Sequence, residues 1–458
     1  MAANTYCEYT QVTPTDNNKW TVSLWFKRAG LGVIENLFAA WQDGSNQTSF
    51  RMYADGTFNF FDYQSGGYTG NLITTRKFRD IGAWMHIVCV WDSDNATAGD
   101  RMKIYINGVE ETAFSTDTNP SSGQATVLNV NSRVMRIGED YDGNNFDGCM
   151  SHFHFIDGTV YDASAFGEVD STSGIWKIKT SPSVTYGNNG FFLKMEDSSN
   201  MDLDSSGNSK SFTTSGNLTA TKDNPSNNFA TWNPSVYNAN PPIFKYGNTE
   251  EEGQSDGRYP NTISTLAFPK SGKWYGEFKK LDPSNDKEAI GIADTEKAIE
   301  AIRANTAIYN TSYEGQVCVR QDGNYITYGS EAAYFGGGSF GDDDIFQIAF
   351  DGDNGAIYFG KNGTWGNSSD PTSGASKTGA VDISGLAWYT AAKSLVFLAG
   401  EISSGGYGHL QANFGNGYFG TTAVASAGTS STNDNSIWEY DCPTGFYGLN
   451  TKNLGSYS

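Results

Sequence analysis

Hydrophobic and polar residues alternate with a period of two over many short stretches of this chain. In the segment TVSLWFK, Val22, Leu24 and Phe26 occupy every second position. The segment RMKIYIN repeats the pattern with Met102 and Ile104. A period of two places one face of a strand on a core and the other face toward water. The pattern therefore predicts amphipathic β-strands.

Short polar breaks separate these predicted strands. They contain Asn, Asp and Gly, which tolerate the positive φ angles that two-residue turns require. Such breaks predict hairpins, and hairpins in succession predict antiparallel meanders. The clearest examples are Ala54-Asp55-Gly56, Asn107-Gly108, Asp322-Gly323 and Asn362-Gly363.

Two segments that lie far apart in the sequence share one pattern. HIVCVWDSDNATAGDRMKIYINGVE starts at His86, and FQIAFDGDNGAIYFGKNGTW starts at Phe346. Each has an apolar strand, an Asp-x-Asp-Asn break and a second alternating strand that ends in Asn-Gly. The repetition predicts corresponding strand connections in two sandwiches of one architecture. The acidic breaks at Asp92–Asn95 and Asp351–Asn354 are expected to be turns, with a weak cation site as the alternative.

One segment has a helical pattern instead. In DTEKAIEAIRAN, which runs from Asp294 to Asn305, the first two residues are candidate N-caps. Ala298, Ile299 and Ile302 form an apolar stripe at helical spacing. We expect one short helix here, inserted in the second half of the chain.

The composition turns polar between Asp197 and Asn240, which suggests a domain boundary near Thr221 to Pro225. The sequence thus predicts two domains, residues 1–222 and residues 223–458, the second with a C-terminal tail. The fold class expected is all-β, with two antiparallel β-sandwiches of the jelly-roll type in tandem. The 53 glycines and the 14% of aromatic residues suit many short strands joined by tight turns.

The charge balance limits the partners of this chain. Its 30 Lys and Arg residues stand against 51 Asp and Glu residues, for a formal net charge of −21. Because affinity for nucleic acid comes largely from Lys and Arg, we expect no nucleic-acid partner. The sequence has no apolar run of 18 residues and no signal-peptide pattern at its start, so we expect neither membrane insertion nor secretion by a signal peptide. The five widely spaced cysteines are expected to be reduced.

Several segments of the first half resemble the laminin-G-like branch of the concanavalin A-like lectin/glucanase sandwiches. Their order and spacing match as well as their residues. The segment FIDGTVYDASAFGE, from Phe155 to Glu168, looks like the version of this domain in tail-fibre and other structural proteins of phages, many of them marine. The matching segments are Trp20–Arg28, Ala83–Ser93, Lys103–Glu110, Met135–Asp140 and Phe146–Gly158.

The second half resembles a SPRY domain, another elaboration of the two-sheet sandwich. The two halves are joined by NNFATWNP, from Asn227 to Pro234, and their pairing looks like a phage virion arrangement. The segments that carry the SPRY resemblance are Ser271–Lys279, Ala289–Asp294, Asp342–Gly363, Leu410–Phe419 and Pro443–Leu454.

Together the resemblances imply a phage virion structural protein without catalytic activity, exposed on the particle as a tail fibre, capsid fibre or decoration. Such a protein is made in the host cytoplasm, contacts other virion proteins, forms a homo-oligomer and recognises glycans of the host surface. A purely architectural decoration protein without a glycan ligand is the main alternative. A polysaccharide-degrading glucanase is a third.

The pattern of acidic residues argues against the glucanase. Laminarinase-type enzymes of this fold place carboxylates at alternate positions of one strand, so that both flank one glycosidic bond. No such i, i+2, i+4 series occurs in this sequence, and the closest acidic pairs lie in Gly- and Asn-rich breaks. We therefore expect no enzymatic activity. These pairs are Asp92/Asp94, Asp140/Asp142, Asp202/Asp204 and Asp351/Asp353.

Calcium is the metal that one loop would suit. The segment EDYDGNNFDG offers the side-chain oxygens of Asp140, Asp142, Asn144 and Asp147 in a Gly-bent loop. A hard cation takes several such oxygens. The alternative is that these residues only form a turn, since Asp and Asn bond their own backbone.

Glycan recognition needs aromatic faces for the C–H surfaces of sugars and polar groups for their hydroxyls, both on loops at a sandwich rim. The loop context selects six aromatic residues as candidates. They are Trp41, Tyr63, Tyr68, Tyr334, Trp365 and Tyr407.

Overall fold

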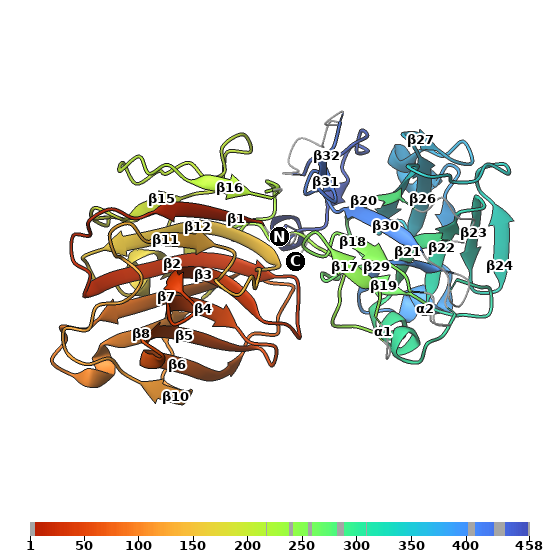
Figure 1. Ribbon diagram of the computed structural model, residues 1–458. Helices are drawn as coiled ribbons and strands as arrows, with labels where there is room; N and C mark the ends of the chain where they lie inside the picture. Colours follow the sequence, from red (N-terminus) through yellow and green to blue (C-terminus); the bar gives the residue numbers. More distant parts are fainter. Residues whose placement is uncertain are drawn as a thin grey trace. The chain divides into compact units, whose positions relative to one another are not determined.

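The computed structural model describes residues 5–216, 218–237, 241–254, 259–281, 288–307, 309–401, 408–425 and 436–456. The chain divides into two compact units, Met1–Ala220 and Thr221–Ser458, close to the boundary predicted at residue 222. Both units are built almost entirely of antiparallel strands (Figure 1). The predicted fold class, two sandwiches of the concanavalin A-like type in tandem, is confirmed.

The first unit contains an eight-stranded and a six-stranded sheet. The eight-stranded sheet has the order β10-β6-β5-β4-β3-β11-β1-β16, and the six-stranded sheet has the order β15-β12-β2-β7-β8-β9. A further pair, β13 and β14, forms a small ribbon. The bounds are β1 Tyr6–Thr10, β2 Lys19–Arg28, β3 Glu35–Asp43, β4 Asn46–Met52, β5 Thr57–Gln64, β6 Gly67–Lys77, β7 Met85–Asp92, β8 Met102–Ile106, β9 Val109–Glu110, β10 Phe114–Thr118, β11 Val134–Ile137, β12 Gly148–Asp157, β13 Gly167–Val169, β14 Trp176–Ile178, β15 Phe191–Leu193 and β16 Thr213–Ser215, with the 3-10 turns η1 Ala98–Asp100 and η2 Ala163–Ala165.

The core of the first unit is rich in aromatic rings. Trp20 of β2 stacks on Trp91 of β7 with ring centroids 6.1 Å apart, and Phe50 stacks on Phe60 at 4.9 Å. All four side chains are almost completely buried. Burying each side chain of this size is worth roughly 2–3 kcal/mol, so these rings supply much of the driving force that closes one sheet on the other.

The second unit repeats the plan. Its larger sheet follows the order β17-β18-β30-β20-β25-β26-β27, with β28 beside β26 and β33 beside β20. Its other main sheet has the order β19-β29-β21-β22-β23-β24, and β31 pairs with β32. The bounds are β17 Ile243–Lys245, β18 Glu250–Glu252, β19 Thr262–Ile263, β20 Lys273–Lys280, β21 Glu288–Asp294, β22 Gln316–Arg320, β23 Asn324–Thr327, β24 Ser330–Ala333, β25 Ile345–Asp351, β26 Ala356–Lys361, β27 Thr364–Trp365, β28 Val381–Asp382, β29 Leu395–Glu401, β30 His409–Asn413, β31 Tyr418–Phe419, β32 Thr422–Ala423 and β33 Tyr447–Gly448, with the 3-10 segment η3 Pro371–Ser376.

The predicted helix is present as α1, Thr295–Arg303, with Asp294 as N-cap. The Oδ1 atom of Asp294 accepts a hydrogen bond of 3.0 Å from the backbone N–H of Lys297, which satisfies one of the free donors at the helix start. The expectation of a single helix was wrong. Two five-residue helices, α2 Ala387–Ala391 and α3 Thr451–Gly455, also occur, and both are too short to show an apolar period.

The repeated sequence pattern corresponds to one structural motif present once in each unit. Lys19 pairs in register with Asp92, and Lys273 pairs in the same way with Asp351. Turns connect β7 to β8 and β25 to β26 at the acidic breaks, as predicted. In Asn107-Gly108 and Asn362-Gly363 all four residues have positive φ, between 47° and 83°. These are the angles that a tight hairpin turn needs.

Asparagine closes both of these hairpins through its side chain as well. Asn107 Oδ1 accepts a hydrogen bond of 2.8 Å from the backbone N–H of His86, and Asn362 Oδ1 accepts one of the same length from Ile345. The shared Asn-Gly motif therefore specifies a turn and a contact to the neighbouring strand, which is a role in the fold.

In the part of the chain that the structure describes, no helix has the length and apolar character needed to span a bilayer.

Candidate functional site

Three of the predicted aromatic residues lie together on the outward face of the eight-stranded sheet. Trp41 of β3 is opposite Gln47 of β4, Gln47 is opposite Tyr63 of β5, and Tyr63 is opposite Tyr68 of β6. Their neighbours along the strands, such as Ala40, point into the core, so these four side chains face outward. Because neighbouring strands are about 4.8 Å apart, Trp41 and Tyr63 are separated by about 10 Å at the backbone.

The rings on this face form two pairs. Trp41 packs edge-to-face against Tyr141 of the loop between β11 and β12, with centroids 6.3 Å apart. Tyr63 packs edge-to-face against Tyr68 at 5.0 Å. Tyr68 is 51% exposed and Tyr141 is 47% exposed, whereas Trp41 and Tyr63 are half-buried. We call these four rings and Gln47 between them the aromatic row.

Two arginines flank the aromatic row. Arg51 of β4 lies over the ring of Phe61 at 5.0 Å, and its Nη2 atom donates a hydrogen bond of 3.1 Å to Gln47. Arg136 of β11 lies over the rings of Tyr6, at 3.9 Å, and Trp41, at 5.1 Å. A guanidinium group over an aromatic face is attracted by the negative charge of that face, so these contacts hold the rings in place.

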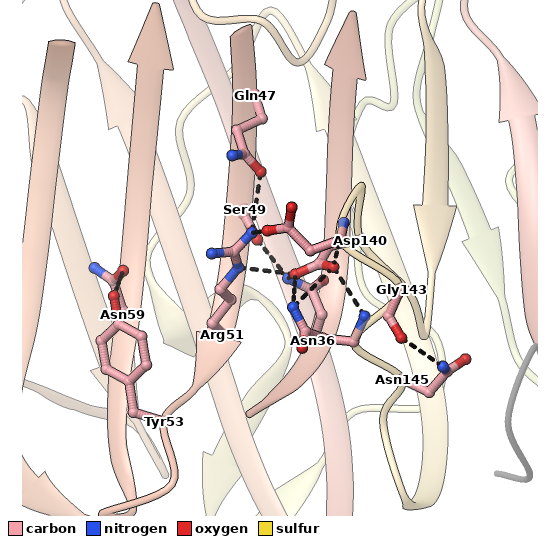
Figure 2. A network of polar contacts seen from close by, with 11 residues as sticks. Asn36, Gln47, Ser49, Arg51, Tyr53, Asn59, Asp140, Gly143 and Asn145 are labelled. Atoms are coloured by element: carbon pink, nitrogen blue, oxygen red, sulfur yellow. Dashed lines mark hydrogen bonds and ion pairs between the residues drawn. The ribbon is translucent and has the colours of Figure 1, made fainter. Parts of the chain in front are cut away.

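Asp140 fastens the loop between β11 and β12 to the sheet. Figure 2 shows its carboxylate between Arg51 and the loop that it belongs to. Arg51 Nε lies 2.8 Å from Asp140 Oδ2, and the Asp140 side chain is fully buried. Its Oδ1 atom accepts hydrogen bonds of 3.0 Å from the backbone N–H groups of Asp142 and Asn144. Asn36 donates to Asp140 at 3.4 Å and also donates to Ser49.

The same network occupies the residues predicted to bind calcium. Asp140 is saturated by these donors, Asp142 Oδ2 lies 3.0 Å from Arg51 Nη2, and Asn144 Nδ2 donates to Asp140 at 3.0 Å. The backbone N–H of Asp147 donates to Glu35 at 3.3 Å. Across the residues that the structure describes, no three His, Cys, Asp or Glu side chains are grouped so as to hold a metal ion. Calcium binding stays a prediction, and it would require Arg51 to be displaced.

The remaining aromatic candidates have different surroundings. Tyr334 is 2% exposed and packs against Phe335 and Phe359, so the expectation that it lies on the surface was wrong. Its Gly-rich flanks suggested an open loop, but its ring belongs to the core of the second unit. Trp365 is half-buried against Tyr275 at 6.4 Å. Tyr407 lies outside the described residues.

A buried Ser23–His86 pair has the composition of a catalytic dyad but the wrong proton arrangement. Ser23 Oγ lies 2.9 Å from His86 Nε2, and Trp176 Nε1 donates a hydrogen bond of 3.0 Å to His86 Nδ1. Burial lowers the pKa of His86 to about 3, so the ring is neutral at pH 7. With Nδ1 as an acceptor, the proton sits on Nε2 and is donated to the serine. The histidine therefore cannot accept the serine proton in this arrangement.

Arg51, Arg136 and Tyr141 are the residues of this face that sequence reasoning missed. Strand alternation would have placed Arg51 on the outward face beside Ser49. Its carboxylate partners come from a loop much later in the chain, and nothing local in the sequence indicates that pairing. Tyr141 lies within the predicted calcium loop, whose sequence signal is its side-chain oxygens and not its ring.

Comparison with known proteins agrees with the architecture of the first unit. Residues 2–164 match the family described as the concanavalin A-like lectin/glucanases superfamily. This stretch is therefore a domain of that superfamily, as its sequence segments suggested. No curated protein matches the chain.

Solved structures similar to parts of the chain include the SPRY domain of human HERC1, with 14% identity, 40% of this chain and 96% of that chain covered, and a TM-score of 0.29. Domains LG4-5 of the mouse laminin α1 chain have 9% identity, with 89% and 85% covered and a TM-score of 0.29. Domain 4 of AbnA, a GH43 extracellular arabinanase from Geobacillus stearothermophilus solved in complex with arabinotriose, has 22% identity, with 32% and 64% covered and a TM-score of 0.26.

Proposed function

We propose that this chain is a structural protein of a phage virion that recognises host-surface glycans without catalysis, through the aromatic row of its first unit. The observation that carries the proposal is the row itself. Four rings that come from three strands and one loop surround Gln47 on one outward face. Aromatic faces pack against the C–H surfaces of sugars. Gln47 is buried and accepts a hydrogen bond from Arg51, so it helps to hold the row together.

The anchoring of the row suits a binding face. The arginines and the Asp140 network fix the rings before any ligand arrives. A preorganised face loses little conformational freedom on binding, which favours affinity. Each face would still bind a sugar weakly, so we propose that the protein acts as a homo-oligomer in many copies, whose combined contacts raise the overall affinity.

The virion role rests on the resemblance of Phe155–Glu168 to phage structural proteins and on the pairing of the two kinds of sandwich. A tail fibre, a capsid fibre and a capsid decoration are the possible places, each with other virion proteins as partners. Antibody labelling of intact particles, viewed by electron microscopy, tests this part. Label on the particle surface is expected, and its absence from purified particles would contradict it.

The absence of catalysis is supported by the chemistry of the polar groups. In the Ser23–His86 pair the proton sits on His86 Nε2, so the histidine cannot accept the serine proton. In the acidic turn at Asp351–Asn354, the Asp351 carboxylate lies 3.1 Å from Lys273 Nζ, and Asp353 accepts a hydrogen bond from the backbone N–H of Gly272. Both carboxylates therefore have structural partners.

A glycan array probed with the full recombinant chain tests recognition. We expect binding to a defined group of oligosaccharides, with no release of reducing sugar from them. If no glycan binds, the recognition role fails and the architectural decoration role replaces it. If reducing sugar is released, the protein is an enzyme and the non-catalytic assignment is wrong.

A further inference from the structure

Both arginines beside the aromatic row are already neutralised by carboxylates. Arg51 lies 2.8 Å from Asp140 and 3.0 Å from Asp142. Arg136 lies 2.8 Å from Glu8 and 2.5 Å from Glu139. Four carboxylates thus face two guanidinium groups. If all six groups are ionised, this cluster carries a net charge of −2.

The geometry leaves these arginines little capacity to hold an anion. Proteins bind sulfate, phosphate and carboxylate groups through the planar fork of N–H donors that arginine presents. The N–H groups of Arg51 are directed to Asp140, Asp142 and Gln47, and only 12% of its side chain is exposed. Arg136 directs Nε and Nη1 to Glu8 and Glu139 while its flat face lies on Tyr6. Both guanidinium groups therefore support the rings of the face.

In two of these four pairs the carboxylate is the more exposed member, whereas Asp140 and Glu139 are buried. The side chain of Asp142 is 51% exposed and that of Glu8 is 30% exposed, against 12% for Arg51 and 23% for Arg136. A ligand on the aromatic row would meet these carboxylates before the arginines. Two unit charges about 4 Å apart in water interact by about 1 kcal/mol, which changes an affinity about fivefold.

We propose that the aromatic row selects neutral glycans and excludes sulfated and carboxylated ones, and that Asp142 and Glu8 determine this selectivity. The inference rests on the proposed glycan recognition and deepens it. Neutral sugars pack on the exposed rings and carry no charge for these carboxylates to repel. Anionic sugars meet the like charges of Asp142 and Glu8, while Arg51 and Arg136 already hold carboxylate partners.

The test is a glycan array that carries neutral oligosaccharides beside the sulfated and uronic acid forms of the same backbones, at about 20 mM and about 150 mM salt. The wild-type chain is expected to bind the neutral forms better. The preference should be larger at the lower salt concentration, because salt screens exposed charges.

Two variants locate the cause, and one serves as a matched control. Asp142→Asn and, independently, Glu8→Gln are each expected to raise binding of the anionic forms about fivefold and to leave the neutral forms unchanged. Asp322→Asn should change neither. Asp322 is also an exposed carboxylate paired with an arginine, Arg320, but it lies in the second unit.

Three outcomes would overturn the inference. Equal or stronger wild-type binding to the anionic forms would refute it and leave glycan recognition standing. Neutral selectivity that is unchanged in both Asp142→Asn and Glu8→Gln, with normal melting temperatures, would show that these carboxylates do not set it. The absence of binding to every glycan would refute the proposed function, and this inference with it.

Discussion

Breaking the buried ion pair between Arg51 and Asp140 by removing the arginine is expected to destabilise the first unit strongly. The two side chains are 12% and 0% exposed, and Nε and Oδ2 lie 2.8 Å apart. Arg51→Met removes the cation and keeps a long side chain over Phe61. Asp140 would then be a buried charge whose remaining partners are amides.

The size of the effect follows from that geometry. Removing one partner of a buried ion pair costs about 3–5 kcal/mol, because the other charge stays buried. The backbone N–H groups of Asp142 and Asn144 still donate to Asp140 in the variant, so they stabilise part of its buried charge. We therefore expect a loss at the low end of this range, about 3 kcal/mol. In a unit of roughly 200 residues this corresponds to a melting temperature lower by about 6–12 °C.

Scanning calorimetry of the full chain measures the loss. We expect a separate transition for each unit, so the second unit serves as an internal control that Arg51→Met leaves in place. The double variant Arg51→Met/Asp140→Asn contains neither charge and is expected to recover much of the lost stability. If the double variant loses the sum of the two single losses, the groups are not coupled and the reasoning is refuted.

Two further predictions concern protons and metal. Burial, together with the neighbouring Glu401 and Glu288, raises the pKa of Glu251 well above its usual value. The folded state therefore keeps a proton that the unfolded chain releases above about pH 4.5, and the stability of the second unit should fall as pH rises from there. The decrease of the second unit's melting temperature between pH 5 and pH 9 should be smaller in Glu251→Gln than in the wild type, and it should be unchanged in Glu252→Gln. If the decrease is the same in both variants, Glu251 is not the group that keeps the proton. Because Arg51 pairs with the predicted calcium loop, we expect a chelator to leave the melting temperature of the first unit unchanged. If a chelator lowers that melting temperature and Asp142→Ala abolishes the effect, calcium is bound in the loop.

Local features of the fold were predictable because local chemistry determines them. The N-cap at Asp294 and the Asn-Gly turns need only neighbouring residues. The outward direction of Trp41 and Tyr63 follows from strand alternation. The alignment of these two residues in one row does not, because it depends on the register of three strands and on a bulge between β5 and β6.

Contacts between distant segments were the part that the sequence did not reveal. Arg51 and Asp140 meet only because β4 and the loop after β11 fold together, and neither segment signals the other. For Tyr334 the local sequence predicted exposure, and tertiary packing buried the ring instead. Its glycine neighbours are typical of a surface loop, yet packing against Phe359 takes its ring into the core. Composition predicts the kind of segment, and tertiary packing decides the position of each side chain.

The affinity of the Tyr68→Ala variant for the best glycan on the array tests the central claim most directly. Tyr328→Ala is the matched control, since Tyr68 is 51% exposed and Tyr328, in the second unit, is 52% exposed. Removing one ring contact is worth roughly 1 kcal/mol. We expect Tyr68→Ala to bind about fivefold more weakly while its melting temperature falls by only a few degrees through the lost contact with Tyr63, and Tyr328→Ala to bind as the wild type does. Equal affinities for Tyr68→Ala and the wild type, or a loss confined to Tyr328→Ala, would contradict the assignment of glycan recognition to the aromatic row.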